Sequence, residues 1–149
     1  MPNEFTRPGI QFMYPDNWTL DEDSSRPECN SVTVTSPSGA FWSVTIHALT
    51  VDPDDLCATV LEAMGEIYDE LESEEMTEKI ADYQLKGYNM NFYCLDLTNT
   101  SKILTFRADK ATYSIFCQAD DRDCKKLKPV FNAISTSLLT NLAKIDNPD

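Results

Sequence analysis

Short segments in which apolar and polar residues alternate constrain the fold of this chain more than any other feature. The clearest pair covers residues 31–35 and 41–48, and residues 37–39 (Pro-Ser-Gly) supply the turn between them. Further segments of this kind cover residues 10–14, 79–85, 88–97, 102–108 and 111–118, with a turn at 98–101. The gaps between neighbours are mostly of hairpin length, which predicts a mostly antiparallel sheet of about six to seven strands.

Two longer segments carry apolar residues at steps of three and four, the spacing of an amphipathic helix. The first begins at Asp52, a suitable N-cap, followed by Pro53 at the first helical position, and its apolar stripe reaches Leu71. The second begins among the aspartates of residues 120–123 and reaches Leu142, with a distortion expected at Pro129. Each stripe must pack on the sheet, so the predicted class is α+β.

The length of 149 residues fits a single domain, residues 1–149. Residues 1–9 are polar and contain two prolines and a glycine, which predicts a mobile N-terminal loop. Residues 21–30 are charged and lack a periodic pattern, so a surface loop is expected there. Residues 143–149 are expected to form a mobile tail.

The charge balance excludes several classes of partner. Lysine and arginine number 12 against 25 aspartates and glutamates, a net charge of −13, which disfavours nucleic acid and anionic membrane surfaces. No apolar run approaches the ~20 residues that a membrane helix needs, so no membrane insertion is expected. The first residues, Met-Pro-Asn-Glu, lack the basic and then apolar build of a secretory signal, which predicts a cytoplasmic protein.

The residues that usually carry chemistry are scarce. The four glycines form no phosphate-binding loop, the five cysteines contain no Cys-x-x-Cys pair, and His47 is the only histidine. The aspartates at 52–55 and 120–123 lack the glycine and distal glutamate of a calcium loop, and the first group is better explained as a helix cap. The sequence therefore predicts no catalytic residue, no metal site and no cofactor.

Two segments resemble one protein family. Residues 9–18 (Gly-Ile-Gln-Phe-Met-Tyr-Pro-Asp-Asn-Trp) are similar to the F-x-Y-P-x-x-W opening of the PsbP and Mog-type family, and residues 129–138 are similar to its last helix. The resemblance extends over most of residues 5–142 and is to a bacterial-like member. It implies an antiparallel sheet covered by helices on both sides, an α/β/α sandwich. Because the family includes a photosystem II subunit, a Ran-GTPase-binding protein and secretion adaptors, it also implies binding rather than catalysis.

The leading functional hypothesis is therefore a non-catalytic protein-interaction or adaptor domain, with two candidate surfaces. The first is a polar side of the sheet, where aromatic rings and amides are typical of recognition; it comprises Phe41, His47, Asn89, Asn91, Tyr93 and Arg107. The second is the acidic face of the first helix, which would steer a basic protein partner; it comprises Glu62, Glu66, Asp69 and Glu70.

Other interpretations stay open for the same residues. A helix or loop that covers the polar sheet side would satisfy its amides internally, and the acidic residues would then form an ordinary solvated helix face. The alternative function is a small-ligand-binding protein or minor enzyme with a pocket near His47, because an imidazole can transfer protons near neutral pH.

Overall fold

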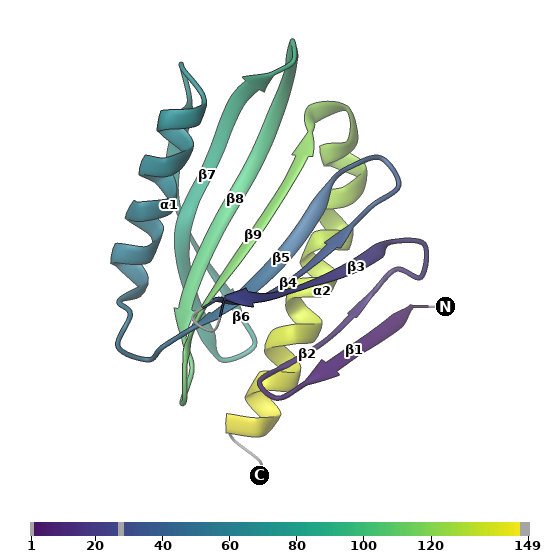
Figure 1. Ribbon diagram of the computed structural model, residues 1–149, viewed down its shortest axis with the longest axis vertical. Coiled ribbons are helices and arrows are strands. Elements are labelled where there is room, and N and C mark those ends of the chain that lie inside the picture. Colours follow the sequence, from purple (N-terminus) through teal and green to yellow (C-terminus); the bar gives the residue numbers. More distant parts are fainter. Residues whose placement is uncertain (1, 27–28, 147–149) are drawn as a thin grey trace.

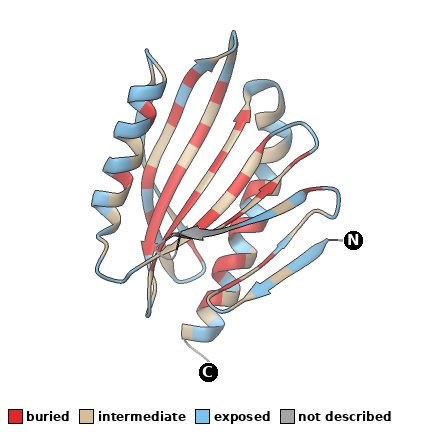
Figure 2. Cartoon of the chain, in the orientation of Figure 1, coloured by how far each residue is buried: buried red, intermediate tan, exposed pale blue. Residues whose placement is uncertain are grey.

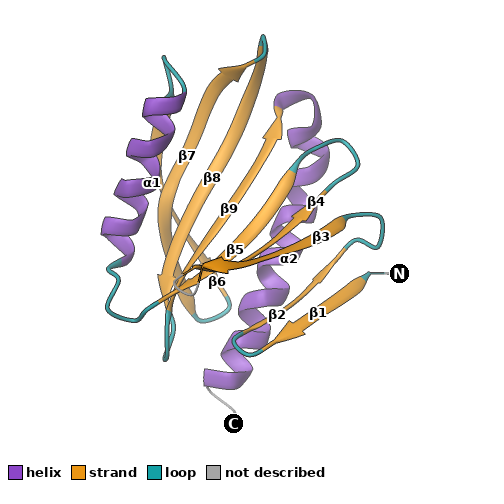
Figure 3. Cartoon of the chain, viewed as in Figure 1, coloured by secondary structure: helices purple, strands orange, loops and turns teal. Residues whose placement is uncertain are grey.

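The computed structural model describes the backbone of residues 2–26 and 29–146, and the side chains of these residues except 23–26 and 29. The strands before the first helix are β1 (Asn3–Arg7), β2 (Ile10–Tyr14), β3 (Thr19–Arg26), β4 (Cys29–Thr35) and β5 (Phe41–His47). They are followed by α1 (Pro53–Ile67), β6 (Glu72–Ile80), β7 (Tyr83–Cys94), β8 (Leu97–Arg107), β9 (Thr112–Asp120) and α2 (Asp121–Asp146), as Figure 3 shows.

Seven strands form one antiparallel sheet in the order β3-β4-β5-β9-β8-β7-β6. The two remaining strands, β1 and β2, form a separate hairpin that lies against α2. α1 lies over β7 and β8 on one face of the sheet, and α2 lies over the opposite face (Figure 1). The predicted α+β class, with an antiparallel sheet between helices, is confirmed. In the described part of the chain, no helix is long and apolar enough to cross a membrane.

Alternating side chains divide the sheet into an α2 face and an α1 face. The register places Val44 beside Ile115 and Ile115 beside Leu104, and all three are buried on the α2 face. The larger core lies on this face, where α2 contributes Ile134, Leu138, Leu139 and Leu142. A smaller core under α1 contains Met64, Met90, Phe92 and Ile103. Burial of these two apolar surfaces supplies the main driving force for folding.

In the larger core, Trp42 connects the sheet with the β1–β2 hairpin and with α2. Its side chain is fully buried, and its ring lies 4.9 Å from that of Phe12 in the hairpin. The indole Nε1 donates a 2.9 Å hydrogen bond to Ser135 Oγ on α2. Two residues further along α2, Ser137 Oγ accepts a 2.9 Å bond from the backbone nitrogen of Met13. α2 is therefore bonded to both the sheet and the hairpin.

Both terminal expectations need correction. Residues 2–9 are not a loop, because Asn3–Arg7 form β1 and Phe5 packs against Phe12 with ring centroids 5.6 Å apart, and residue 1 lies outside the described residues. Residues 143–146 are not a frayed tail, because Leu142 is buried and the Tyr83 hydroxyl donates a hydrogen bond to the Asp146 carboxylate, which together hold the last turn of α2. Residues 147–149 lie outside the described residues.

The surface loop expected at residues 21–30 is also wrong. β3 pairs with β4 through backbone partners such as Leu20 with Val34 and Glu22 with Val32. β3 is an edge strand, and backbone pairing on one side does not require an alternating apolar pattern. Residues 27 and 28 of this segment lie outside the described residues.

The hairpin turns around β7 fall at unexpected places. The predicted strand at 79–85 spans a turn at Ala81 and Asp82, and Ala81 has a φ of 54°. The next turn lies at Leu95 and Asp96, so the turn predicted at 98–101 lies inside β8. Asn99 and Thr100 favour turns by residue type, but their pairing with Phe92 and Asn91 overrides that preference.

The first helix ends earlier than predicted, so part of the predicted acidic face lies beyond it. α1 ends at Ile67, and Tyr68 is its C-cap, with its backbone nitrogen bonded to the Met64 oxygen. The helix therefore stops short of the predicted Leu71. At the other helix, Pro129 lies inside α2, which continues on both sides of it.

We predict that Ser135→Ala lowers the free energy of unfolding by about 1–3 kcal/mol, because it leaves the buried Trp42 N–H without an acceptor. Thr136→Ala, at an exposed position of the same helix, is the matched control and should change stability by less than about 0.5 kcal/mol. Urea denaturation measures both. Equal effects of the two substitutions would contradict the role given to this hydrogen bond.

Candidate functional site

The six sheet residues predicted to form one polar surface do not share a face. Strand pairing connects Trp42, Cys117, Lys102 and Asn89 in one row across the sheet, on the α2 face. The expected grouping is therefore wrong. Alternation shows which side chains of one strand share a face. It does not show which face of β7 continues a given face of β5, because β9 and β8 lie between these strands and their turns set the register. On the α1 face lie Phe41, His47 and Arg107; on the α2 face lie Asn89, Asn91 and Tyr93.

The first group occupies the part of the α1 face that α1 leaves uncovered. α1 packs on β7 and β8 and reaches β9, whereas the outward residues of β5 stay half-buried, as the tan bands in Figure 2 show. Phe41 stacks on Phe116 with ring centroids 5.8 Å apart. Arg107 donates a 3.2 Å bond to the Val51 oxygen and so anchors the segment before α1. This surface is partly open and internally bonded.

His47 has an internal partner on the neighbouring strand. Its Nε2 lies 3.0 Å from Ser114 Oγ. Burial lowers the pKa of His47 below its usual value, which favours the neutral ring. The arrangement gives the imidazole a structural hydrogen bond, and the pocket expected near this residue stays a prediction.

Three large apolar side chains are exposed at one end of the molecule. Ile67 is 68% exposed, Tyr93 is 65% exposed and Leu95 is 91% exposed. They lie where α1 ends and where the β7–β8 hairpin turns, at the top of Figure 1. We call these three residues the apical patch. Ile67 and Tyr93 line the same cleft, and Leu95 lies in the turn that follows the strand of Tyr93. Exposed apolar side chains at one end of a molecule are candidates for an interaction surface.

Leu95 is unusual in conformation as well as in exposure. Leu95 and Asp96 have φ values of 52° and 64°, and they connect the paired residues Cys94 and Leu97. Two successive positive φ angles in a two-residue hairpin loop are typical of a type I′ turn, which strongly favours Asn-Gly. A leucine there costs about 1–2 kcal/mol in backbone strain and gains nothing from burial. Neither turn chemistry nor packing explains this leucine.

Two of the predicted acidic residues border the apical patch. Asp69 and Glu70 line a shallow cleft with Ile67, Tyr68 and Tyr93. They lie in the loop after α1, with Glu70 at a φ of 52°, and not on the helix face expected from the sequence. The chain turns away there because the apolar ring of Tyr68 stacks on Phe92, with centroids 4.0 Å apart.

The other two acidic residues, Glu62 and Glu66, are exposed on α1 itself. The structure therefore brings Tyr93, Asp69 and Glu70 together from the two surfaces that were predicted separately. Sequence reasoning missed Ile67 and Leu95. The signal in the sequence was a leucine at a turn position. Because the turn was predicted at residues 98–101, Leu95 was assigned to a strand and the signal was missed.

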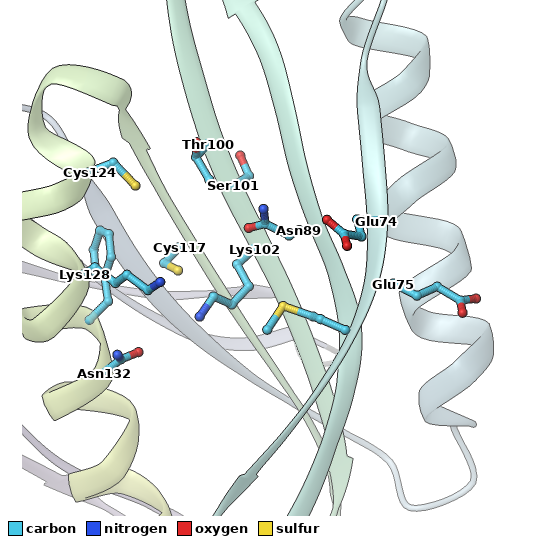
Figure 4. A pocket seen from close by; sticks show the side chains of 12 residues that line it. Glu74, Glu75, Asn89, Thr100, Ser101, Lys102, Cys117, Cys124, Lys128 and Asn132 are labelled. Carbon is cyan, nitrogen blue, oxygen red and sulfur yellow. The ribbon is translucent and has the colours of Figure 1, made fainter.

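A second cleft, here called the α2 cleft, separates the first half of α2 from the strands β6–β9 (Figure 4). Its volume is about 350 Å³. Asn89 is the one predicted residue that lies here. The other side chains that line it include Glu74, Met76, Thr100, Lys102, Cys117, Cys124, Lys128, Phe131 and Asn132. No local motif unites these residues, because they come from five different elements.

The Cys117 thiol in the α2 cleft is not set up as a nucleophile. Burial raises the pKa of Cys117 to about 12, and the opposing effect of Lys102 is smaller. The thiol therefore stays protonated near neutral pH, and a protonated thiol reacts slowly.

Comparisons with known proteins support the fold. No protein-family model matches the chain, and no curated protein matches its sequence. Among solved structures, the cyanobacterial PsbP of Synechocystis sp. PCC 6803 superposes with a TM-score of 0.61 at 11% identity, covering 92% of this chain and 89% of that one. A protein of unknown function from Pseudomonas aeruginosa gives 0.56 at 12% identity, covering 92% and 95%.

A Bacteroides thetaiotaomicron structure gives a TM-score of 0.62 at 13% identity, where the match covers 91% of this chain but 47% of that one. Identities this low show the fold alone. The chain has a PsbP-like fold.

We predict that Leu95→Asn raises the free energy of unfolding by about 0.5–1 kcal/mol, because asparagine tolerates positive φ and the exposed leucine loses no packing. Leu49→Asn, at another exposed leucine that is 43% accessible, serves as the control and should not stabilise the protein. Thermal unfolding measures both. A loss of stability in Leu95→Asn would show that the turn is not strained.

We predict that a thiol reagent at neutral pH modifies Cys94 and Cys124 well before Cys57 and Cys117, because the latter two are buried and burial raises the pKa of both thiols. Mass spectrometry of peptides after timed labelling gives the order. Early labelling of Cys117 in the folded protein would contradict the assignment of an inert thiol.

Proposed function

We propose that this chain is a non-catalytic protein-interaction domain of the PsbP and Mog-type family, which binds a basic protein partner through the apical patch. The observation that carries the proposal is Leu95, which is 91% exposed in a conformation that disfavours leucine. An exposed apolar side chain in a strained backbone conformation supports a function outside the fold.

The surroundings of the patch favour a particular kind of partner. Asp69 and Glu70 lie beside Ile67 and Tyr93, and Asp96 follows Leu95 in the turn. An apolar centre with a charged rim is the usual anatomy of an interface, and Tyr is among the residues enriched at its energetic centre. The rim is acidic and the net charge is −13, so a segment with Lys or Arg around one or two apolar side chains is complementary.

The small-ligand alternative gains no support around His47, whose ring bonds to Ser114. Binding through the apical patch remains the function that the exposed side chains favour.

The test compares capture by the unmodified protein with capture by Leu95→Asn, with cytoplasmic and membrane fractions of the host treated separately. A protein that binds through the patch is retained by the unmodified chain and by the control Leu49→Asn but is lost with Leu95→Asn. The purified candidate should then bind the unmodified chain at least about tenfold more tightly than Leu95→Asn, as expected for loss of a buried leucine anchor. Capture of the same proteins by all three variants would refute the proposal.

Salt separates the acidic rim from the apolar centre. With the purified candidate, affinity should fall as ionic strength rises, and the double substitution Asp69→Asn with Glu70→Gln should weaken that dependence. Because both side chains are exposed, these changes should leave the fold intact. Affinity that is insensitive to both salt and this double substitution would rule out a basic partner segment at this site.

A further inference from the structure

One side of the β1 backbone is open. β1 pairs with β2 alone and lies at the outer border of the molecule in Figure 1. A two-residue turn closes this hairpin, so Arg7 and Ile10 form a hydrogen-bonded pair, and bonded and non-bonded pairs alternate along the strands. The backbone N–H and C=O groups of Glu4 and Thr6 therefore point away from β2.

The contacts of β2 support this assignment independently. Gln11 lies opposite Thr6, and Met13 lies opposite Glu4. The Gln11 backbone oxygen and the Met13 backbone nitrogen are bonded to side chains of α2, at 3.2 Å and 2.9 Å. These groups point away from β1, so both pairs are of the non-bonded kind.

The open side carries four polar backbone groups in a row, the N–H and C=O of Glu4 and of Thr6. Within residues 2–26 and 29–146, none of the four has a hydrogen-bond partner in a turn, a loop or a side chain. A row of unpaired strand groups is the feature to which another extended chain adds by backbone pairing.

Charge distinguishes this edge from the two edges of the large sheet. The outermost strands of that sheet, β3 and β6, carry several carboxylates each, and charge of one sign opposes pairing between copies. β1 has one glutamate and one arginine and is therefore neutral, although the net charge of the chain is −13. A second copy thus meets the least repulsion at β1.

We propose that two copies of this chain pair through β1, antiparallel to each other, across a twofold axis at Phe5. This register places Glu4 opposite Thr6 of the second copy, and the reverse pair is identical by symmetry. Each of the two pairs exchanges two hydrogen bonds, so all four open groups of each strand find a partner. The two hairpins then form one continuous antiparallel sheet.

The side chains suit this register. Glu4 lies opposite a threonine and Arg7 lies opposite Asn3, so no like charges face one another directly. The Phe5 side chains, which are half-buried in one copy, lie beside each other at the axis. An aromatic pair across two strands adds apolar contact to the backbone bonds.

The strand is also held in place before it pairs. Arg7 Nη1 donates a 2.8 Å bond to Glu22 Oε1 on β3, and the ring of Phe5 packs on Phe12. A strand that is already extended loses little conformational freedom when it pairs. Because the contact is small, we expect a weak dimer that forms at high protein concentration.

The test combines sedimentation velocity with amide hydrogen exchange of the purified protein, both at concentrations that rise to the near-millimolar level. We expect the sedimentation coefficient to rise with concentration. The amides of residues 4 and 6 should become protected at the same time, since their exchange slows in proportion to the fraction of protein that stays monomeric.

Thr6→Pro should fold normally and weaken the dimer by about tenfold or more, because it removes an outward N–H of each copy and no internal bond. Thr77→Pro is the matched control. Thr77 is an exposed threonine on the edge strand β6, and its N–H also points outward, because Ile80 and Tyr83 form the bonded pair at the next turn. This variant should dimerise like the unmodified chain, and unfolding curves verify that both variants are folded.

Three results would overturn the proposal. A monomer at every concentration would leave the β1 edge to an extended segment of another protein. Equal association of the two proline variants, or a dimer in which residues 4 and 6 exchange as fast as in the monomer, would place the contact on another surface. Leu95→Asn should dimerise normally, which separates failure of this contact from failure of the apical patch.

Discussion

The packing of α2 on the sheet is the interaction on which the other parts of the structure depend. A single helix of 26 residues covers the central strands, holds the β1–β2 hairpin and forms one wall of the α2 cleft. The hydrogen bond from Trp42 to Ser135 is part of this contact, because a buried indole N–H must find an acceptor and the helix supplies it. The first half of α2 is held less closely than the second, since its buried residues begin at Phe131.

Periodicity predicted those parts of the fold in which one side chain in two, or one in three to four, is buried. The alternation of Trp42 and Val44 with Ser43 is the clearest instance, and it correctly assigns the faces of β5. It failed where burial is one-sided or absent. β3 is an edge strand with a charged sequence, and β1 is held mainly by Phe5, so neither shows a period that a sequence reader can detect.

The candidate sites were less predictable, for a geometric reason. Asn89 and His47 were predicted on one face because each is adjacent in sequence to an apolar residue. Which face of β7 matches a given face of β5 depends on the register across β9 and β8, and therefore on where each turn lies. Misplacing the turn at Leu95 and Asp96 hid the residue that stands out most in the structure. The side chains that line the α2 cleft come together only through tertiary packing, so residue spacing gives no sign of the cleft.

β6 forms one border of the seven-stranded sheet, and its first residues are almost entirely acidic. An unpaired strand edge offers hydrogen bonds to any extended chain, and natural proteins commonly protect it with charge. Glu72, Glu74 and Glu75 are exposed along this border, so two copies of the molecule that approach edge to edge bring six carboxylates together. Sheet growth from molecule to molecule is thereby suppressed at neutral pH, and acidification, which neutralises carboxylates, removes that barrier.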